Sequence, residues 1–521
     1  MKANNRLTLP CLKFGIASGL TTCLVTCSVL ALTGCAVPQV TRTAQTIPVI
    51  PEAEQEQRTV VKEGASVLEF YYPNRSVEED KNDPNRISDA KLAYPAKTLP
   101  RLPVLFESGD AFLNHGPIKP GIETPAGQML QPSFLLYGDL RTALQSFDDG
   151  VQSRSEQTNR INLHGNVHLS GTERIVFTVR PLDSATGEFT GYNFGSDSGS
   201  ARSGNDDGWH ESVNGTITRL FFEGEFGEIF PGLDPADSGT LDWGFSVGRQ
   251  PVMLQDGILL NDEIDLVGVT RNSLINGIMP NLRMTAIYGW NEVNRSHNRR
   301  QDKSARLFAL LSEADTSWDS TIALDVIYVN DDYQTDAWYL GASSIQRMGM
   351  INTAFRVNAS MPDDGESAAV DGGVILSAEF SRTMHGSDNL MYLNAFWSID
   401  HFTQAARSAD AGPAVANLGL LYSPVGMGRY SVPLGGSIAD TFGSTFGYQM
   451  YLDGIRSQLI VEVGARTSTS SGSDDQDAFG VAARYQRAIG LRHLLRFDAF
   501  AASVANNRTS HGLRVEWKVK F

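Results

Sequence analysis

Charged side chains recur at alternate positions of the sequence from about residue 133 to the C-terminus, in runs whose intervening positions are apolar. In the run of residues 174–180, the even positions include Arg174, Thr178 and Arg180, whereas the odd positions are Ile, Phe and Val. Successive side chains of a strand point to opposite faces, so the arginines of this run would share one face. Where Arg and Lys side chains are arranged in a ring around a membrane pore, they favour the passage of anions. The pattern therefore indicates polar strand faces that could contact a negatively charged solute.

In each run, the polar residues occupy every second position. These positions contain twelve basic and eight acidic residues in total, so we expect the face that they share to be net basic. The candidates for contact with a solute are Arg141, Arg174, Arg180, Arg219, Arg283, Arg306, Asp139, Glu223, Asp325 and Glu379. The alternative is that these charges pair across neighbouring strands and only hold the wall together, and we expect this for most of them.

Enzyme chemistry has no comparable support in the sequence. No GxSxG, HExxH, Walker or EF-hand pattern is present. His164 and His168 share one face of a run, with Asn166 between them, and polar filler is the simplest account of them. We therefore expect no catalytic residues, no cofactor and no metal, and we keep a barrel hydrolase only as a third alternative.

The first residues have the composition of an export signal. Three basic residues precede the apolar run of residues 14–32, which ends in "LTGC", residues 32–35. This ending resembles the lipobox of bacterial lipoproteins, and the resemblance implies that Cys35 is acylated and becomes the first mature residue. Ala36 follows in place of the Asp that favours inner-membrane retention, which suggests the outer membrane. We expect residues 1–34 to be a lipoprotein-type signal peptide.

Net charge and cysteine positions limit the partners of the mature protein. Removing residues 1–34, which carry three basic and no acidic residues, would take the net charge from −16 to −19. A chain this acidic is not expected to bind nucleic acid. The four cysteines are Cys11, Cys23, Cys27 and Cys35, so the mature chain could form no internal disulfide and no cysteine-ligated metal site.

The texture of the chain changes near residue 131. Residues 35–131 are rich in Pro, Glu, Gln and Lys without a sustained period, which predicts a periplasmic linker or irregular N-terminal segment. From residue 132 to 521, alternating runs of roughly ten residues are separated by short turns and by longer polar loops in alternation. This predicts an all-β fold, a transmembrane antiparallel β-barrel of about 18 strands, with a range of roughly 16 to 20.

The last nine residues, "LRVEWKVKF", fit a soluble sandwich or a barrel when taken alone. Together with the lipobox, the cysteine-free mature fold and the alternating loop lengths, they favour the barrel. Trp517, Val519 and Phe521 share the apolar parity of a strand that stops at a bare Phe. The segment resembles the signal that the outer-membrane insertion machinery reads. That machinery, outer-membrane lipid and lipopolysaccharide are therefore expected partners of an integral barrel in the Gram-negative outer membrane, which Cys35 would also anchor by its lipid.

Residues 243–274 carry a family resemblance. This stretch resembles the strand, long loop and strand around the "GRQ" motif of outer-membrane porins of the alginate-export type and of related substrate-specific porins. The matching residues are Gly248, Arg249, Gln250, Gly257, Asn261 and Asp265. The resemblance implies a passive channel of about 18 strands for an anionic saccharide or a similar solute. Arg249 shares the parity of Trp243, Phe245 and Val247, so parity alone would point it at lipid unless a bulge re-aims it.

Two functions remain open on the sequence alone. The first is a porin-like channel for passive passage or export of polar or anionic solutes such as saccharides and polysaccharides. The alternative is a plugged barrel that serves as a surface scaffold, or as an assembly partner through residues 36–131. Whether the loops at 184–215 and 400–444 fold into the pore bears directly on this choice.

Overall fold

The structure is a computed structural model. It describes residues 104–109, 121–150, 152–184, 188–196, 207–236, 238–274, 279–295, 303–316, 319–365, 370–436, 438–470, 477–505 and 508–521. Residues 1–103, and Cys35 with them, lie outside these ranges. Among the described residues, no helix has the length and apolar character needed to cross a bilayer.

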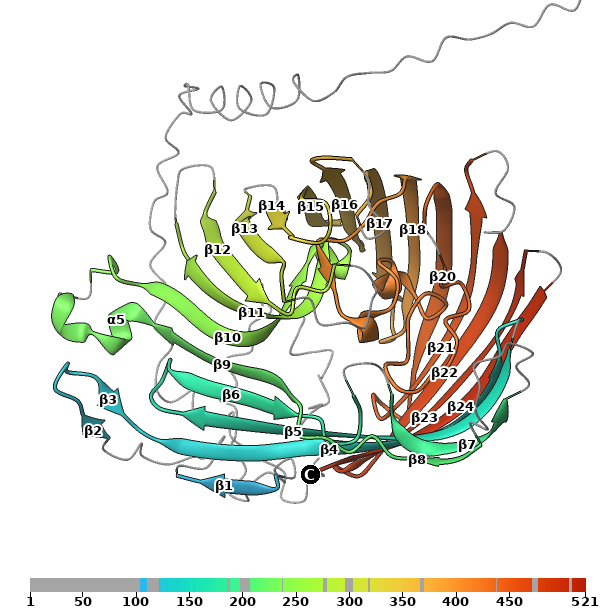
Figure 1. Cartoon of the computed structure of the whole chain (residues 1–521), viewed down its shortest axis with the longest axis horizontal. Coiled ribbons are helices and arrows are strands. Elements are labelled where there is room, and N and C mark those ends of the chain that lie inside the picture. Colours follow the sequence, from blue (N-terminus) through green and yellow to red (C-terminus); the bar gives the residue numbers. More distant parts are fainter. Residues whose placement is uncertain are drawn as a thin grey trace, which may run out of the picture. The chain divides into compact units, whose positions relative to one another are not determined.

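Eighteen antiparallel strands form a closed barrel (Figure 1), which confirms the predicted fold class. In chain order they are β4 (Ser133–Asp148), β5 (Ser153–His168), β6 (Arg174–Val179), β9 (Ile217–Glu225), β10 (Trp243–Leu254), β11 (Leu260–Arg271), β12 (Asn281–Asn291), β13 (Arg306–Asp315), β14 (Ser320–Asn330), β15 (Ala337–Met348), β16 (Ile351–Pro362), β17 (Gly373–Thr383), β18 (Leu390–Asp400), β20 (Thr441–Leu452), β21 (Ser457–Ser468), β22 (Ala478–Ile489), β23 (His493–Val504) and β24 (Arg508–Lys520). The last strand, β24, pairs with the first, β4, and closes the ring.

The other elements are short. They are β1 (Phe106–Ser108), β2 (Ile122–Glu123), β3 (Met129–Leu130), β7 (Thr190–Ser196), β8 (Gly208–His210), α5 (Phe226–Ile229), η2 (Pro231–Leu233), η3 (Gln255–Gly257), β19 (Ala406–Arg407), η4 (Ala409–Ala411) and η5 (Ala416–Leu418). Both β6 and β7 pair with β5, so β7 continues the line of β6 in the wall. Some connections at one end of the barrel are short, such as residues 349–350 and 490–492, whereas two at the other end span 180–216 and 401–440.

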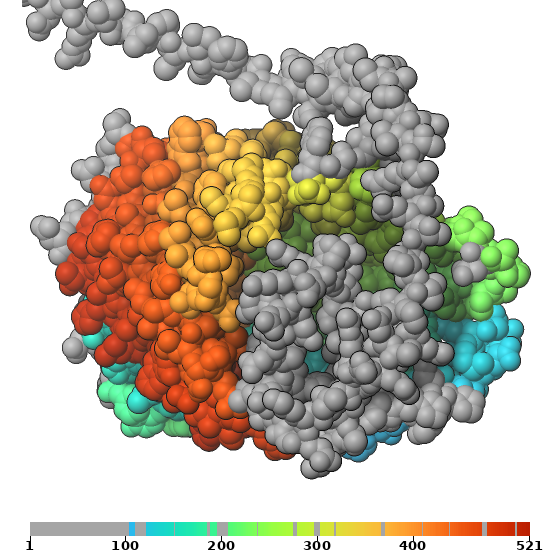
Figure 2. All heavy atoms as spheres, turned by 180° about the vertical axis from the view of Figure 1, so that it is seen from behind, coloured from blue at the N-terminus to red at the C-terminus, as the bar shows by residue number. Residues whose placement is uncertain are grey.

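Period-two alternation gives the wall an apolar outer face. Leu310, Leu324, Phe446 and Leu513 are among the exposed large hydrophobic residues, and their neighbours along each strand are turned toward the lumen. Figure 2 shows the part of this wall that is coloured yellow to red as a continuous surface. A closed barrel with such an outer face belongs to the class of outer-membrane β-barrels.

The outer face provides a matched test of orientation. Leu324 points outward near the middle of β14, whereas its neighbour Ala323 lines a water-accessible cavity next to Glu313. We expect Leu324→Arg to destabilise the barrel in lipid, lowering its free energy of unfolding by about 2–4 kcal/mol, and Ala323→Arg to change that free energy little. Urea titration of the barrel folded into liposomes measures both. Equal costs for the two variants would contradict the assigned orientation.

The seam between the first and last strands is held by a buried ionic network. Arg141 Nε lies 2.7 Å from Glu516 Oε1, and the fully buried Arg514 binds Gln145, Asp498 and Glu516. The backbone of Phe521 exchanges hydrogen bonds of 2.6 and 2.9 Å with Gly138. The C-terminal residue therefore extends the seam beyond β24.

Residues 401–440 fold into the lumen. Figure 1 shows this orange segment inside the ring of strands. Leu418, Leu421 and Tyr422 of this segment are almost fully buried, and they belong to one apolar cluster with wall residues such as Phe396. The sequence left open whether this stretch enters the pore, and the structure answers that it does. We call residues 401–440 the plug loop.

Glycines in the wall make room for the plug loop. A side chain at Gly464 or Gly480 would meet Leu421 at 3.0 or 3.2 Å. The loop is also fixed by hydrogen bonds, since the amides of Leu420 and Leu421 donate to the Glu462 carboxylate at 2.9 and 2.8 Å. This half of the plug loop is thus built into the wall formed by β20, β21 and β22.

Candidate functional site

The β10–β11 hairpin leaves the wall at Gly248. Strand β10 pairs with β9 only as far as Arg249, and β11 pairs with β12 only from Asp265, with a register shift between Asp265 and Leu266. Gly248 has a φ of +123°, and a Cβ there would lie 2.3 Å from the Leu220 carbonyl oxygen. Only glycine has ready access to that conformation, which turns the chain out of the wall. Beyond this level the two strands pair with each other, and β11 also pairs with β19.

Because the hairpin leaves the wall, Arg249 does not point outward as the alternation of side chains along its strand predicts. Its guanidinium does not point at lipid: Nε and Nη2 donate to Asp265 at 2.7 and 3.0 Å, and Nη2 also donates to Glu292 at 3.1 Å. Because the hairpin turns inward at Gly248, residues of outward parity now face the channel interior. The motif residue Gln250, in contrast, donates to Ser246 Oγ at 2.8 Å.

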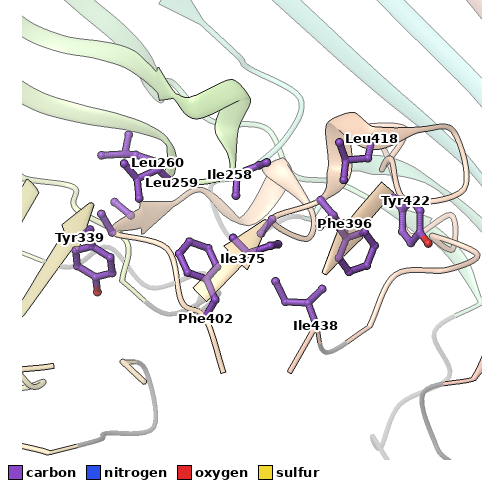
Figure 3. Packing of buried hydrophobic residues seen from close by; sticks show 14 of the residues in the cluster. Ile258, Leu259, Leu260, Tyr339, Ile375, Phe396, Phe402, Leu418, Tyr422 and Ile438 are labelled. Carbon is purple, nitrogen blue, oxygen red and sulfur yellow. The ribbon is translucent and has the colours of Figure 1, made fainter. Parts of the chain in front are cut away.

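The inward hairpin has one apolar face and one polar face. Ile258, Leu259, Leu260 and Ile264 are almost fully buried in the lumenal apolar cluster. Figure 3 shows residues 258–260 packed near Tyr339, Phe402 and Ile375. The other face carries Arg249, Asn261 and Glu263, which line a cavity. The hairpin therefore separates an apolar half of the lumen from a polar half.

The polar cavity has a volume of 280 Å³ and lies beside β5, β9 and the hairpin. We call it the constriction cavity. Its charged lining residues are Arg160, Arg180, Arg219, Arg249, Asp183, Asp262, Glu263, Glu292 and Asp410, which makes four arginines against five carboxyl groups. Polar groups that converge on a cavity of this kind are typical of a solute-binding site.

The arginines of the constriction cavity are fixed by partners but keep unused N–H groups. Arg180 donates to Asp183 and, at 2.8 Å, to Asp410 of the plug loop. Arg219 Nε donates to Glu263 at 2.9 Å, which joins β9 to the hairpin. Since a guanidinium has five N–H donors, each can hold its protein partner and still donate to a solute.

Arg407 joins the plug loop to the hairpin tip. It is almost fully buried, and its donors bind the carbonyl oxygens of Gly257, Ala411 and Gly412 at 2.6, 2.6 and 2.5 Å. It also donates to the Pro413 carbonyl. Burial lowers the pKa of Arg407 to about 10, so it still carries its charge at neutral pH.

The ten predicted solute contacts are divided among several places. Arg180 and Arg219 line the constriction cavity. Arg283 and Asp325 line a second cavity of 450 Å³ on the side of β12 to β15, and Glu223 lines a third of 530 Å³. The other five residues have wall or loop partners: Arg141 with Glu516, Asp139 with Lys518, Arg174 with Glu223, Glu379 with Arg356, and Arg306 with the Trp290 carbonyl.

Charge around the cavities differs from the net basic face inferred from parity. The constriction cavity has more carboxyl groups than arginines. The 450 Å³ cavity has two arginines and three carboxyl groups, and an outer cavity of 240 Å³ beside β5, β7 and β8 also has two arginines and three carboxyl groups. The excess of carboxyl groups comes from residues that lie outside the wall strands, such as Asp256, Asp410 and Glu188, so the alternation along those strands does not predict them.

Arg160 was not among the predicted solute contacts, although the sequence carried a signal for it. It continues the alternating polar positions of Arg154, Glu156 and Thr158 on β5.

The remaining sequence candidates lie at the rim and the seam. Asp183 and Ser184, at the start of the 184–215 loop, line the constriction cavity, whereas 185–187 and 197–206 lie outside the described residues. Trp517 is half exposed on the outer face, where it donates to His493 at 3.2 Å, and Val519 pairs with His493 and Leu140 in the wall. In the described part of the chain, no group of three His, Cys, Asp or Glu side chains is placed to hold a metal ion.

No family model matches the chain, and no curated protein matches it in sequence. Several solved structures match its fold. The OccK9 (OpdG) structure of Pseudomonas aeruginosa is 12% identical, with a TM-score of 0.49, and the match covers 74% of this chain and 98% of that one. A BenF-like porin from Pseudomonas fluorescens Pf-5 is 11% identical, with a TM-score of 0.49 and the same coverage.

A further match is OccK2 (OpdF) of Pseudomonas aeruginosa in complex with glucuronate, which is 12% identical with a TM-score of 0.46, again over 74% and 98% of the two chains. None of these three is described as an enzyme. Identities of this size do not carry a substrate or a residue role from one protein to another.

Proposed function

We propose that the chain is an outer-membrane channel for small hydroxylated solutes that carry a carboxylate, such as sugar acids. The observation that carries this proposal is the constriction cavity, in which arginines and carboxyl groups face one water-accessible space beside β5 and β9. A sugar acid offers its carboxylate to the arginines and its hydroxyl groups to the carboxylates. Both halves of the lining would then have a partner.

The shape of the lumen supports an off-centre passage. The apolar face of the hairpin shares a cluster with residues of the wall from β13 to β18, whereas the constriction cavity lies beside β5 and β9. The plug loop also reaches this polar side, since Arg160 of β5 donates to the Gly426 carbonyl. A cavity of 280 Å³ suits one small solute better than a folded polymer chain. Export of a polysaccharide is therefore the less supported form of the channel hypothesis.

The scaffold alternative also has a specific observation in its favour. The plug loop is seated on wall glycines and hydrogen-bonded to Glu462, as expected of a permanent plug. A barrel of this kind would hold its shape without conducting. Solute permeation separates the two functions.

Permeation into proteoliposomes tests the channel and its preference together. We expect glucuronate to pass, and Arg219→Gln to slow glucuronate roughly tenfold while slowing glucose much less, because a charge-assisted hydrogen bond to the carboxylate is lost. Arg487→Gln is the matched control, since Arg487 pairs with Asp453 at an exposed turn. Impermeability to both sugars would favour the scaffold, and equal slowing of both would remove the carboxylate from the proposal.

We also propose that Cys35 carries a lipid that tethers the N-terminal segment to the membrane. The support is the lipobox-like "LTGC" and the position of every other cysteine before it. Metabolic labelling with a fatty-acid analogue should mark the wild type and leave Cys35→Ser unmarked. A mature chain that begins at another residue would contradict this proposal.

A further inference from the structure

We propose that the inward β10–β11 hairpin is a hinged gate whose tip lifts away from the wall at β14 to β16 and opens a wider passage. The movement stands on the structure alone, whereas its effect on conduction rests on the channel function proposed above.

Both strands of the hairpin are irregular at the same level, as a hinge requires. Gly248 has its positive φ on β10, and Leu266, its partner across the hairpin, follows the register shift on β11. Beyond this line, β10 and β11 have no ladder pairing to β9 or β12 in the described residues. The arm can therefore turn about this line without breaking backbone ladder hydrogen bonds of the wall, and turning would break the side-chain hydrogen bonds of Arg219 to Glu263 and of Asn294 to Asp262.

Arg249 is placed to latch the base of the arm. It lies directly beyond the hinge, and it bridges Asp265 on β11 and Glu292 after β12, with a weaker contact of 3.4 Å to the Ile217 carbonyl near β9. These groups come from three neighbouring segments of the wall. Arg249 thus contacts both neighbours of the arm at its base, and Arg219–Glu263 and Asn294–Asp262 add one link to each side, so Arg249 is one positioning residue of the gate.

The tip packs on the wall through the apolar side chains of residues 258–260, and beside them its seat has a polar part. Gln255 Nε2 donates to Asp325 at 2.6 Å, and Gly341 makes room for the side chains of Gln255 and Leu259. Next to Gly341 lies Asn358, which is fully buried, yet neither its amide oxygen nor its amide nitrogen has a partner among the described residues. The amide oxygen of Gln255 is also unpartnered there.

Unpartnered amides are costly beneath a permanent contact, because each loses its hydrogen bonds to water and gains none. If the tip lifts part of the time, water reaches Asn358 and bonds its amide, so the average free-energy cost of this residue is lower than under a permanent contact. The same cost weakens the closed seat and favours lifting of the tip. Arg407, which binds the Gly257 carbonyl, would carry residues 411–413 of the plug loop along with the tip.

Thiol labelling tests the movement without any assumption about conduction. All four native cysteines lie within residues 1–35, so Asn358→Cys introduces a single reactive position in the barrel, and it breaks no hydrogen bond. We expect a small water-soluble thiol reagent to label Asn358→Cys slowly, Ser343→Cys in the open 450 Å³ cavity quickly, and the parent barrel not at all. Adding Arg249→Gln should speed labelling at position 358 by about tenfold, whereas adding Arg487→Gln should not.

Conductance then tests whether the movement gates the pore. Gln255→Cys with Asp325→Cys, bridged by a short bifunctional thiol reagent, should remove the larger of two conductance levels. The matched pair Ala323→Cys with Ser343→Cys, which are cross-strand partners in the fixed wall, should leave both levels.

Absence of labelling at position 358 in both backgrounds would overturn the movement, and so would a labelling rate there as fast as at position 343. If position 358 is labelled but bridging leaves the conductance unchanged, the movement does not gate the pore. If the protein shows no conductance at all, the channel function is contradicted, and the labelling rates still test the movement.

Discussion

Replacing residues 402–438 by a short Gly/Ser linker is expected to raise the single-channel conductance severalfold. The linker can close the gap because Asp400 and Asp440 already lie side by side, with the Asp440 amide donating to the Asp400 carbonyl at 3.1 Å. Strands β18 and β20 are paired neighbours, so the wall stays closed without the loop. Removing the plug loop leaves the hairpin as the main obstacle in the lumen.

The control for this deletion is Leu421→Ala, which keeps the plug loop but empties its seat between Gly464 and Gly480. We expect it to destabilise the barrel by about 2–5 kcal/mol with only a small change of conductance. A deletion variant that folds and conducts no better than the wild type would show that the plug loop does not limit the passage.

Arg514→Met is expected to destabilise the barrel by about 3–5 kcal/mol, because it leaves buried carboxylates with fewer partners. Arg514 is 1% exposed and binds Gln145, Asp498 and Glu516 at the seam that closes the ring. Arg508→Met, at an exposed position of the same strand, is the control. Urea midpoints of the barrels in liposomes measure the difference.

A second variant keeps this prediction open to contradiction if the single change prevents folding. Arg514→Lys keeps a positive charge beside Asp498 and Glu516, so it should lose less stability than Arg514→Met. Equal midpoints for Arg514→Met and Arg508→Met would mean that the seam does not depend on this network.

The wall could be predicted from the sequence because each strand carries its own period-two pattern. The last strand shows this most clearly, since Leu513, Val515 and Trp517 are exposed on the outer face, whereas Arg514 and Glu516 are buried at the seam. Side-chain alternation is a local property of an extended chain, so it needs no knowledge of the neighbouring strands. The closed ring of eighteen strands follows from the number of such runs.

The interior could not be predicted in the same way. Parity assigns a side chain to one of two faces only while its strand stays in the wall, and the hairpin leaves the wall at Gly248. Arg249 and Glu263 therefore face the constriction cavity from positions of outward parity. The acidic excess has a related cause, because Asp410 reaches the cavity from a loop that has no period. Both features depend on long-range packing inside the barrel, which local alternation does not encode.

Conductance of the purified wild-type protein in a planar bilayer tests the central claim most directly. The account predicts discrete single-channel steps with weak ion selectivity, because arginines and carboxyl groups are nearly balanced around the constriction cavity. It also predicts that Asp410→Asn shifts the reversal potential toward anions and Arg219→Gln shifts it toward cations. No steps from the wild type, with conduction only after the plug loop is removed, would contradict the channel and leave a plugged scaffold.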